Sequence, residues 1–245
     1  MSAAITLEDV TFCYGKTTII EGLSLKAQAG DVLSLLGPSG SGKSTLLRII
    51  MGFLAPSRGV VRVRGQVASE AGRVIMPPEE RNLAVVFQNL ALWPHLTVEG
   101  NLAFGLRSKR VPDAEAAKRI AQVLEDVGLA GTHMCYPAQL SGGEQQRVAI
   151  ARALVLQPDA VLLDEPLSNL DIGLREDLLH LFSKLFREYQ TTALCVTHDP
   201  WEARELGGRV IMLDEGHVVS TGSLDELDPA HENPFVRLVC RHLAR

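Results

Sequence analysis

The sequence predicts an α/β fold in which a mostly parallel sheet is covered by helices and joined by an antiparallel β subdomain and a helical insertion. Short apolar runs rich in branched residues recur along the chain, and segments of helical length separate them. The first 30 residues differ, since they alternate in short stretches punctuated by glycine. The chain has 245 residues, 46% of them apolar, which is enough for one large domain or two closely packed ones.

The apolar runs are expected to be strands buried on both faces of the main sheet. They are Val32 to Leu36, Leu83 to Phe87, Ala160 to Leu163, Thr192 to Val196 and Val210 to Leu213. Residues 60–67 share the alternating texture of the N-terminal segment, so the two together predict an antiparallel sheet packed beside the main one.

Between Val98 and Leu156 the pattern becomes helical, which predicts an insertion of about 60 residues. Residues 114–127 place their apolar side chains on one helical face: Ala117, Ile120, Ala121, Val123, Leu124 and Val127. We therefore divide the chain into an α/β core with its antiparallel subdomain (1–88 and 158–225), a helical subdomain (89–157) and a C-terminal tail (226–245).

Composition limits the partners and the location of the chain. The net charge is -5 and basic residues are scattered, so there is no electrostatic case for a nucleic-acid partner. The N-terminus MSAAITLEDV lacks the features of a secretory signal, and no apolar run approaches the roughly 18 to 20 residues that span a bilayer. We therefore expect a soluble, cytoplasmic chain. The cysteines form no C-x-x-C pair, which argues against a zinc site and a local disulfide framework; they are Cys13, Cys135, Cys195 and Cys240.

A glycine-rich loop follows the first predicted core strand. The segment GPSGSGKST fits G-x-x-x-x-G-K-[ST], with Gly37, Gly42, Lys43 and Ser44 at the fixed positions. Glycines let backbone N–H groups point at phosphates, and the positive end of the following helix points to the same place. We expect Lys43 to neutralise the β and γ oxygens of a nucleotide and Ser44 to bind Mg²⁺.

This loop predicts binding of ATP with Mg²⁺. The candidate nucleotide-binding residues are Gly37, Pro38, Ser39, Gly40, Ser41, Gly42, Lys43, Ser44 and Thr45. A chance glycine-serine loop is the alternative, but a buried strand precedes the loop and the apolar helix TLLRIIMGFL follows it, as the motif requires. The loop alone does not separate a kinase, a GTPase, a helicase or a transporter motor.

Two adjacent acids, Asp164 and Glu165, end the apolar strand AVLLDEP. At the carboxyl end of such a strand both side chains can turn into the crevice where ligands bind. One acid can organise magnesium and its water while the other accepts a proton from the attacking water. The alternative is an ordinary acidic strand end.

The segment LSGGEQQRVAIARAL, residues 140–154, starts with a helix cap. Ser141 and Glu144 form a capping box, and Gly142 and Gly143 leave the first N–H groups of the helix bare. A cap does not require two glycines, which cost roughly 1 kcal/mol each inside a helix, whereas bare N–H groups make an anion site. With this segment the sequence resembles the ATP-binding cassette ATPases over residues 3 to 225, which implies a P-loop NTPase core of the RecA-like type.

In that family the signature segment contacts the γ-phosphate of the nucleotide held by the other subunit. The resemblance therefore implies that Ser141, Gly142 and Gly143 act in trans, in a head-to-tail homodimer that closes around two ATP molecules. It also implies that Glu165 and His198 guide hydrolysis.

Further residues match family landmarks one by one. Tyr14 resembles the aromatic that stacks on adenine, although a tyrosine at a strand end also packs in cores. Gln88 resembles the glutamine that touches magnesium and the attacking water, so it joins Asp164 as a candidate metal ligand. Asp171 resembles the acid of the loop that crosses between subunits. His198 resembles the histidine that contacts the γ-phosphate, although a lone histidine in a loop is commonly solvated surface.

Residues 77–106 resemble importers of sugars, polyamines, ferric iron or other small oxyanions. Trp93, Pro94 and Leu96 follow Gln88 closely, and they form either a docking surface for a helix of a membrane subunit or the core of the helical insertion itself. The resemblance implies a peripheral ATPase at the cytoplasmic face of the inner membrane that powers import of a small solute. Its partners would be integral membrane permease subunits and an extracytoplasmic solute-binding protein.

Other members of the family supply the alternatives. The motor of an exporter or of a lipoprotein-release system would share every catalytic residue. A cassette acting on nucleic acid or ribosomes needs a coiled-coil insertion or a second cassette, for which 245 residues leave no room. The transported solute cannot be identified from this chain, because it touches other subunits.

Two features depart from the family pattern. Gly207 and Gly208 stand where many relatives have alanine and aspartate, and we expect them to loosen the end of the preceding helix. Many sugar-type importers continue into a regulatory domain, whereas this chain ends at Arg245, so we expect no such regulation.

Overall fold

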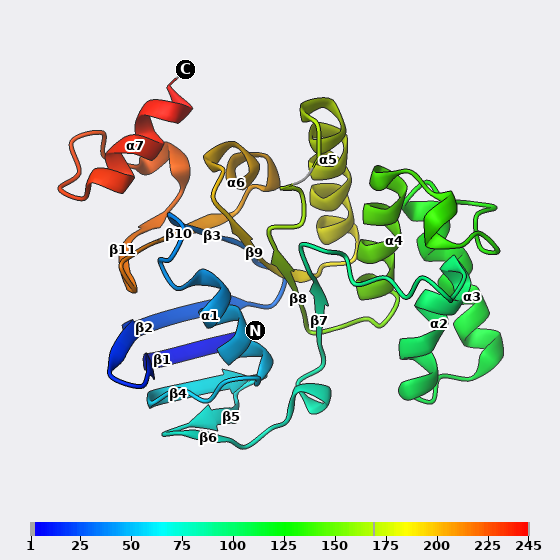
Figure 1. Cartoon of the computed structure of the whole chain (residues 1–245), viewed down its shortest axis with the longest axis horizontal. Helices are drawn as coiled ribbons and strands as arrows, with labels where there is room; N and C mark the ends of the chain where they lie inside the picture. Colours follow the sequence, from blue (N-terminus) through cyan, green and yellow to red (C-terminus); the bar gives the residue numbers. More distant parts are fainter. Residues whose placement is uncertain (1–2, 169, 245) are drawn as a thin grey trace.

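The computed structural model describes residues 3–168 and 170–244, and it confirms the predicted α/β class. The main sheet contains β3 (Val32–Leu36), β7 (Leu83–Val86), β8 (Ala160–Asp164), β9 (Thr192–Thr197), β10 (Arg209–Asp214) and β11 (His217–Gly222). Its strand order is β11-β10-β3-β9-β8-β7 (Figure 1), and every neighbouring pair is parallel except β10 with β11.

The two edges of this sheet differ from the prediction. Burial on both faces is confirmed for β9, which is buried at every position. It is wrong for β7, whose Leu83 and Val85 are only half-buried, because β7 is the outermost strand and one of its faces is incompletely covered. At the other edge, the unpredicted β11 adds an antiparallel strand to β10.

The second sheet is antiparallel, as predicted. It contains β1 (Ala3–Tyr14), β2 (Thr17–Gln28), β4 (Arg58–Val63), β5 (Gln66–Glu70) and β6 (Arg73–Val74), in the order β2-β1-β4-β5-β6. Helix α1 (Lys43–Met51) lies between the two sheets (Figure 1). Leu7 of β1, Leu35 of β3 and Ile49 of α1 belong to one buried apolar cluster, so the two sheets and this helix share a core.

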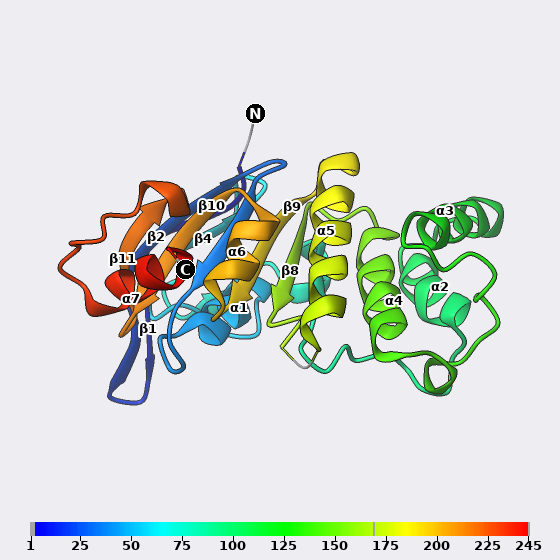
Figure 2. The ribbon, with the colours of Figure 1, turned by 90° about the horizontal axis from the view of Figure 1, so that it is seen from above.

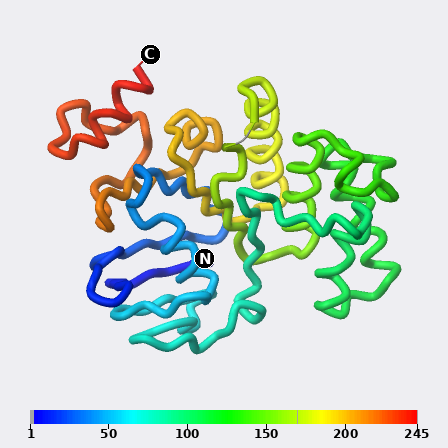
Figure 3. The backbone as a smooth tube through the Cα atoms, viewed as in Figure 1, coloured from blue at the N-terminus to red at the C-terminus, as the bar shows by residue number. Residues whose placement is uncertain are grey.

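The helical insertion leaves the main sheet after β7 and returns to it at β8, as the chain trace shows (Figure 3). It contains α2 (Val98–Ser108), α3 (Asp113–Asp126), the short 3-10 helix η2 (Pro137–Gln139) and α4 (Gly142–Leu154). These helices gather at one end of the molecule in both side and top views (Figures 1 and 2).

The predicted buried face of α3 is only partly correct. Ile120 and Val123 are buried as expected. Ala117 and Ala121 are exposed, and Ala116 is buried instead. Alanine is small enough to sit on the solvent face of a helix at little cost, so its position does not report the buried face as reliably as a branched side chain does.

The remaining helices cover the opposite face of the main sheet and its edge. They are α5 (Ile172–Glu188), α6 (Pro200–Leu206) and α7 (Pro234–Leu243), with the short 3-10 helix η3 (Leu224–Glu226). Another 3-10 helix, η1 (Pro78–Glu80), lies in the connection from β6 to β7. Along β8, Leu162 packs in the cluster that contains α1, whereas Leu163 packs in the cluster that contains α5. Val236 of α7, within the predicted tail, packs with Met212 of β10. Among the described residues, no helix is long and apolar enough to cross a membrane.

Arg81 is a fully buried cation between the core and the antiparallel sheet. Its guanidinium donates to the carbonyl oxygens of Ile49 (3.1 Å) and Ile50 (2.6 Å) near the end of α1. It also donates to the carbonyl oxygen of Ala68 (3.0 Å) and the hydroxyl of Ser69 (2.6 Å) in β5. One side chain therefore satisfies carbonyl groups at the end of α1 and links this helix to the second sheet.

Gly207 and Gly208, which the sequence predicts to loosen the preceding helix, lie directly after the last residue of that helix. Helix α6 ends at Leu206, and both glycines follow it with positive φ angles of 71° and 84°. A Cβ atom on Gly208 would overlap the carbonyl oxygen of Val32. The pair forms a tight turn into β10 that a larger residue at 208 could not adopt.

Candidate active site

The glycine-rich loop connects β3 to α1, and its glycines are required by close contacts. A Cβ atom on Gly37 would overlap the carbonyl oxygen of Leu213 and lie 2.5 Å from Oγ of Ser41. Gly42, directly before α1, has a φ of 100°, and a Cβ atom there would lie 3.0 Å from the carbonyl oxygen of Ile19 in β2. The loop conformation therefore depends on glycine at both positions.

Lys43 carries the positive charge of the loop and is buried. Its Nζ donates to the carbonyl oxygens of Gly37 (2.7 Å) and Pro38 (2.8 Å). Burial lowers the pKa of Lys43, and the negative charges of Glu165 and Asp164 oppose this shift. The ammonium group is thus held inside the loop, with both strand-end acids close enough to affect it.

The start of α1 fits an anion. Gly42 supplies no side chain to cap the first N–H groups of the helix, and the first turn contains no acidic residue. Oγ of Ser41 is buried without a hydrogen-bond partner among the described residues, whereas Ser44 is exposed and Thr45 is half-buried. Uncapped N–H groups, an unpartnered hydroxyl and a lysine are the donor set that a phosphate group needs.

The two acids at the end of β8 lie beside this loop. Asp164 lines a cavity of about 340 Å³ together with Gln88. Burial raises the pKa of Asp164, and the charge of Glu165 raises it further. Glu165 adopts a positive φ of 47°, and its N–H donates to the carbonyl oxygen of Val196 in β9 (3.0 Å). The chain thus turns sharply between the two carboxylates.

Residues from the ends of three neighbouring strands meet here. Nδ1 of His198, after β9, lies 3.5 Å from Oε2 of Glu165, after β8. Nε2 of Gln88, after β7, donates to Oγ of Ser168 (3.1 Å), and Ser168 donates to the carbonyl oxygen of Glu165 (3.1 Å). The imidazole of His198 is exposed to solvent, and its Nδ1 also faces the carboxylate of Glu165. The structure therefore brings together Lys43, Asp164, Glu165, Gln88 and His198.

Tyr14 lies at the end of β1, and its side chain is 47% exposed. The ring contacts Phe12 edge to face, with centroids 4.8 Å apart. Core packing, the alternative for this residue, is therefore wrong. Strand β2, which pairs with β1 and follows Tyr14, approaches the loop at Gly42 through Ile19.

The capping box at the start of α4 is confirmed. Both the N–H (2.8 Å) and the hydroxyl (2.7 Å) of Ser141 donate to Oε2 of Glu144, and these hydrogen bonds lower the pKa of Glu144. Gly143 is buried, and a Cβ atom there would lie 2.6 Å from the side chain of Leu174 in α5. Gly142 is exposed, and its Cβ atom would approach only Leu170, at 3.9 Å. Packing explains the glycine at 143 but not the glycine at 142.

Asp171 caps α5, since its Oδ1 accepts from the N–H of Leu174 (3.1 Å). It therefore lies beside the start of α4. Strand β8 and helix α5 separate α4 from α1 in both views (Figures 1 and 2). The structure does not bring Ser141, Gly142, Gly143 or Asp171 to the glycine-rich loop of the same chain.

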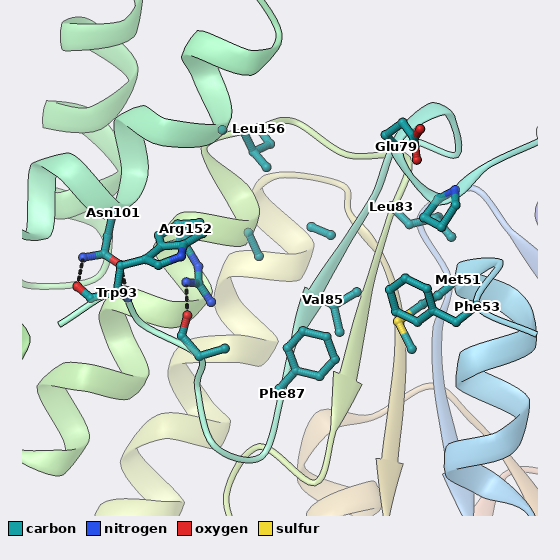
Figure 4. A pocket seen from close by; sticks show the side chains of 15 residues that line it. Met51, Phe53, Glu79, Leu83, Val85, Phe87, Trp93, Asn101, Arg152 and Leu156 are labelled. Carbon is teal, nitrogen blue, oxygen red and sulfur yellow. Dashed lines mark hydrogen bonds between the residues drawn. The ribbon is translucent and has the colours of Figure 1, made fainter. Parts of the chain in front are cut away.

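An apolar cavity of about 400 Å³ lies between the end of α1 and the helical insertion, along β7 (Figure 4). Met51 and Phe53 line one side of it, and Trp93 and Arg152 line the other (Figure 4). Trp93 also packs on Phe104 of α2, with ring centroids 4.6 Å apart, and the guanidinium carbon of Arg152 lies 5.1 Å from its ring centroid. Trp93 is therefore half-buried against an exposed aromatic ring, and it belongs to the wall of the cavity rather than to the buried core of the helical insertion.

Sequence reasoning missed the polar residues that support this site. Ser168 joins Gln88 to the Glu165 loop, and Arg175, Thr197 and Glu202 surround the backbone beside His198. The spacing of two of them was a usable signal, because Glu202 lies four residues after His198 and Arg175 four after Asp171. Residues four apart in a helix lie on the same face, so such a side chain can reach back toward the start of its helix.

Comparisons with known proteins agree with this arrangement. The profile of the family described as "ABC transporter" matches residues 20–168, which include the glycine-rich loop, Gln88, the start of α4 and both acids. The chain is 43% identical over 240 residues to the spermidine/putrescine import ATP-binding protein PotA of Thermobifida fusca, covering 96% of this chain and 60% of that protein. It is 40% identical over 235 residues to the trehalose/maltose import ATP-binding protein MalK of Thermococcus litoralis, covering 96% of this chain and 63% of that protein.

Among solved structures, the fold matches cbiO1 from Clostridium perfringens, described as part of the ABC transporter complex cbiONQ, with a TM-score of 0.83 and 27% identity. The match covers 91% of this chain and 89% of cbiO1. The chain spans less than two thirds of the length of the two import proteins, and it shares their sequence across nearly all of its own length. The chain belongs to the ABC transporter family.

Proposed function

We propose that this chain is the ATP-binding and ATP-hydrolysing subunit of an importer that carries a small solute across the cytoplasmic membrane. The observation that carries the proposal is the group formed by Lys43 in the glycine-rich loop with Asp164, Glu165, Gln88 and His198 at three strand ends. Open parallel sheets bind ligands at this edge. The word import in the names of both sequence relatives supports the direction of transport.

The loop would hold the phosphates of ATP. Lys43 would neutralise their charge, the bare N–H groups at the start of α1 would donate to their oxygens, and the exposed ring of Tyr14 would stack on adenine. Mg²⁺ would be held by Ser44, Gln88 and Asp164, and when bound it supplies further neutralisation of phosphate charge. Hydroxyl, amide and carboxylate oxygens are a donor set that suits this metal.

Glu165 would act as the general base. Its carboxylate would accept a proton from the attacking water, and His198, 3.5 Å away, would contact the γ-phosphate and orient this carboxylate. The positive φ of Glu165 supports a functional role, because non-glycine residues with this strained backbone conformation cluster at active sites.

A second copy of the chain would complete the site. Ser141, Gly142 and Gly143 lie away from the loop of their own chain, and the exposed Gly142 has no packing reason to be glycine. A head-to-tail homodimer would bring this helix start to the γ-phosphate of the partner and would carry Asp171 across the interface.

The apolar cavity beside Trp93 would dock a helix from an integral membrane permease subunit. Its walls are largely apolar, and Phe53 at its edge is 59% exposed, which is unusual for a large apolar side chain without a partner. The chain would then lie peripherally on the cytoplasmic face of the inner membrane and work with an extracytoplasmic solute-binding protein. The named solutes of the two relatives are a polyamine and a sugar, so they do not single out a substrate.

The test is the variant Glu165→Gln. We expect it to bind ATP, to lose hydrolysis by about 100-fold or more because a general base contributes that much, and to accumulate as a dimer on size-exclusion chromatography with ATP. Glu188→Gln, at an exposed acid of α5, is the control and should hydrolyse ATP normally. A Glu165→Gln chain that stays monomeric at saturating ATP would refute the head-to-tail arrangement, and unchanged hydrolysis would refute the role of Glu165.

A further inference from the structure

One guanidinium connects two loops of the candidate site. Arg175 lies in the first turns of α5, four residues after the cap Asp171. Its Nη2 donates to the carbonyl oxygen of Leu170 (3.3 Å), in the loop that carries Asp171. Its Nη1 donates to Oδ2 of Asp199 (3.2 Å), the residue after His198. A single guanidinium therefore contacts the residue before Asp171 and the residue after His198.

The residue on the other side of His198 is also held. The hydroxyl of Thr197 donates to Oε2 of Glu202 (2.5 Å) and accepts from the N–H of Asp199 (3.0 Å). Oε1 of the same Glu202 lies 3.6 Å from Nε of Arg175. The backbone is thus fixed at Thr197 and at Asp199, while the imidazole between them extends toward Glu165.

Glu202 is an unusual residue at this place because it is a carboxylate with 4% exposure. Burial raises the pKa of Glu202, and the charge of Arg175 and the hydrogen bond from Thr197 oppose this shift. A buried ion pair contributes little net stability compared with well-packed apolar residues of the same size. What Arg175 does contribute is fixed orientation, because its planar guanidinium makes its hydrogen bonds to Leu170 and Asp199 in set directions.

We propose that Arg175 is a positioning residue that holds the loop carrying Asp171 and the loop carrying His198 in one fixed relation. The proposal rests on the proposed ATPase function and adds a physical connection between the two loops of that site. Asp171 would meet the second copy of the chain, so Arg175 would link closure of the dimer to the placement of His198 beside the γ-phosphate. The loop that binds ATP makes no contact with Arg175 among its hydrogen bonds in the described residues.

This arrangement predicts a specific kinetic signature. Loss of Arg175 should misplace His198, which acts in the transition state, without weakening the binding of ATP to the glycine-rich loop. A small misplacement of such a group lowers the rate of the chemical step strongly. We expect Arg175→Ala to lower kcat for ATP hydrolysis by about tenfold or more, with KM for ATP changed by less than about twofold. Arg175→Lys should recover part of kcat, since an ammonium keeps the charge but cannot donate to Leu170 and Asp199 with the geometry of a guanidinium. Arg187→Ala, at an exposed arginine of the same helix, is the control and should match the wild type.

A double variant separates positioning from a structural role. Arg175→Ala leaves Glu202 buried without its cation, so the melting temperature should fall. Adding Glu202→Gln removes that charge and keeps an acceptor for Thr197, so the double variant should regain the melting temperature but not kcat. Recovery of wild-type kcat by the double variant would overturn the proposal, since Arg175 would then only neutralise Glu202.

The same measurements distinguish failure of the proposed ATPase function from failure of the proposed role of Arg175. A wild-type chain that does not hydrolyse ATP would overturn the proposed function and this inference together. A wild-type chain that hydrolyses ATP, with Arg175→Ala equal to it in kcat or altered mainly in KM, would overturn the inference alone. Low kcat in Arg175→Ala and in the double variant, with partial recovery in Arg175→Lys, is the result we expect.

Discussion

The starts of α1 and α4 make an instructive comparison, because both are helix N-termini preceded by glycine-containing loops. Helix α1 begins without any capping side chain and has no acid in its first turn. Its first residue is the buried Lys43. Helix α4 is capped by its own residues, since Ser141 and Glu144 satisfy each other, and it has a carboxylate at its positive end.

The difference indicates two ways to use a helix start. The site at α1 has its own cation and unsatisfied donors, so one chain supplies what a phosphate group needs. The site at α4 is already stabilised by its cap and offers only the N–H groups beside the exposed Gly142. Under the proposed function, the first would bind an anion alone, whereas the second would add contacts to an anion held by another copy of the chain.

The strongest way to break this comparison is to truncate one polar side chain at each site. Lys43→Ala should weaken ATP binding by about 1.5 to 3 kcal/mol, or about 10- to 150-fold in Kd, because it removes charge-assisted hydrogen bonds to phosphate. Ser141→Ala should leave binding of ATP to the monomer unchanged and impair ATP-driven dimer formation. Isothermal titration calorimetry at a concentration where the chain is monomeric gives both affinities. Equal losses in the two variants would contradict the division of roles.

Substitutions of the two glycines of α4 test the same division of roles between the two helix starts, with smaller expected effects. Gly143→Ala should lower the free energy of unfolding by about 1 to 3 kcal/mol, because its Cβ atom would press on Leu174. Gly142→Ala should keep or raise stability by about 0.5 to 1 kcal/mol, since alanine favours the helix and meets no close atom. Only Gly142→Ala should combine normal urea unfolding with reduced ATP-driven dimerisation. A Gly142→Ala chain that dimerises normally would mean that the α4 site does not meet an anion.

The smallest expected effect concerns pH. The pKa of Glu144 lies below its ordinary value because Ser141 donates two hydrogen bonds to the ionised carboxylate. A lowered pKa in the folded state gives stability that is complete above the ordinary value and is lost as pH falls through the folded pKa. The urea midpoint of the wild type should therefore fall more on acidification from neutral pH than that of Glu144→Gln. Helix α1 has no acid in its first turn and no equivalent titration. An equal fall of the urea midpoint in both chains would rule out this cap as the source of the pH dependence.

The sequence was sufficient for features that depend on local pattern. The glycine-rich loop, the strand that precedes it and the capping box at Ser141 are each encoded in a few adjacent residues, and the structure agrees with them. Branched residues at Ile120 and Val123 identified the buried face of α3, whereas alanines misidentified it.

What the sequence could not supply depends on residues far apart in the chain. Strand β7 has the same apolar composition as the central strands, and only its place at the edge explains why Leu83 is half-buried. The contact between Glu165 and His198 requires that β8 and β9 be neighbours, which no local pattern specifies. The same holds for Glu202, whose partner Arg175 lies earlier in the chain on another helix.

Arg81 sets a limit on how this protein can be divided. Its guanidinium takes acceptors from the end of α1 and from β5, and Gly52 leaves the room that it occupies. A fragment that kept Arg81 but lacked the antiparallel sheet would leave part of a buried guanidinium without its acceptors, which is costly. Splitting the chain between the two sheets, for complementation or for grafting onto another protein, would therefore separate Arg81 from its acceptors in β5. A junction for such engineering belongs in the exposed turns outside this contact.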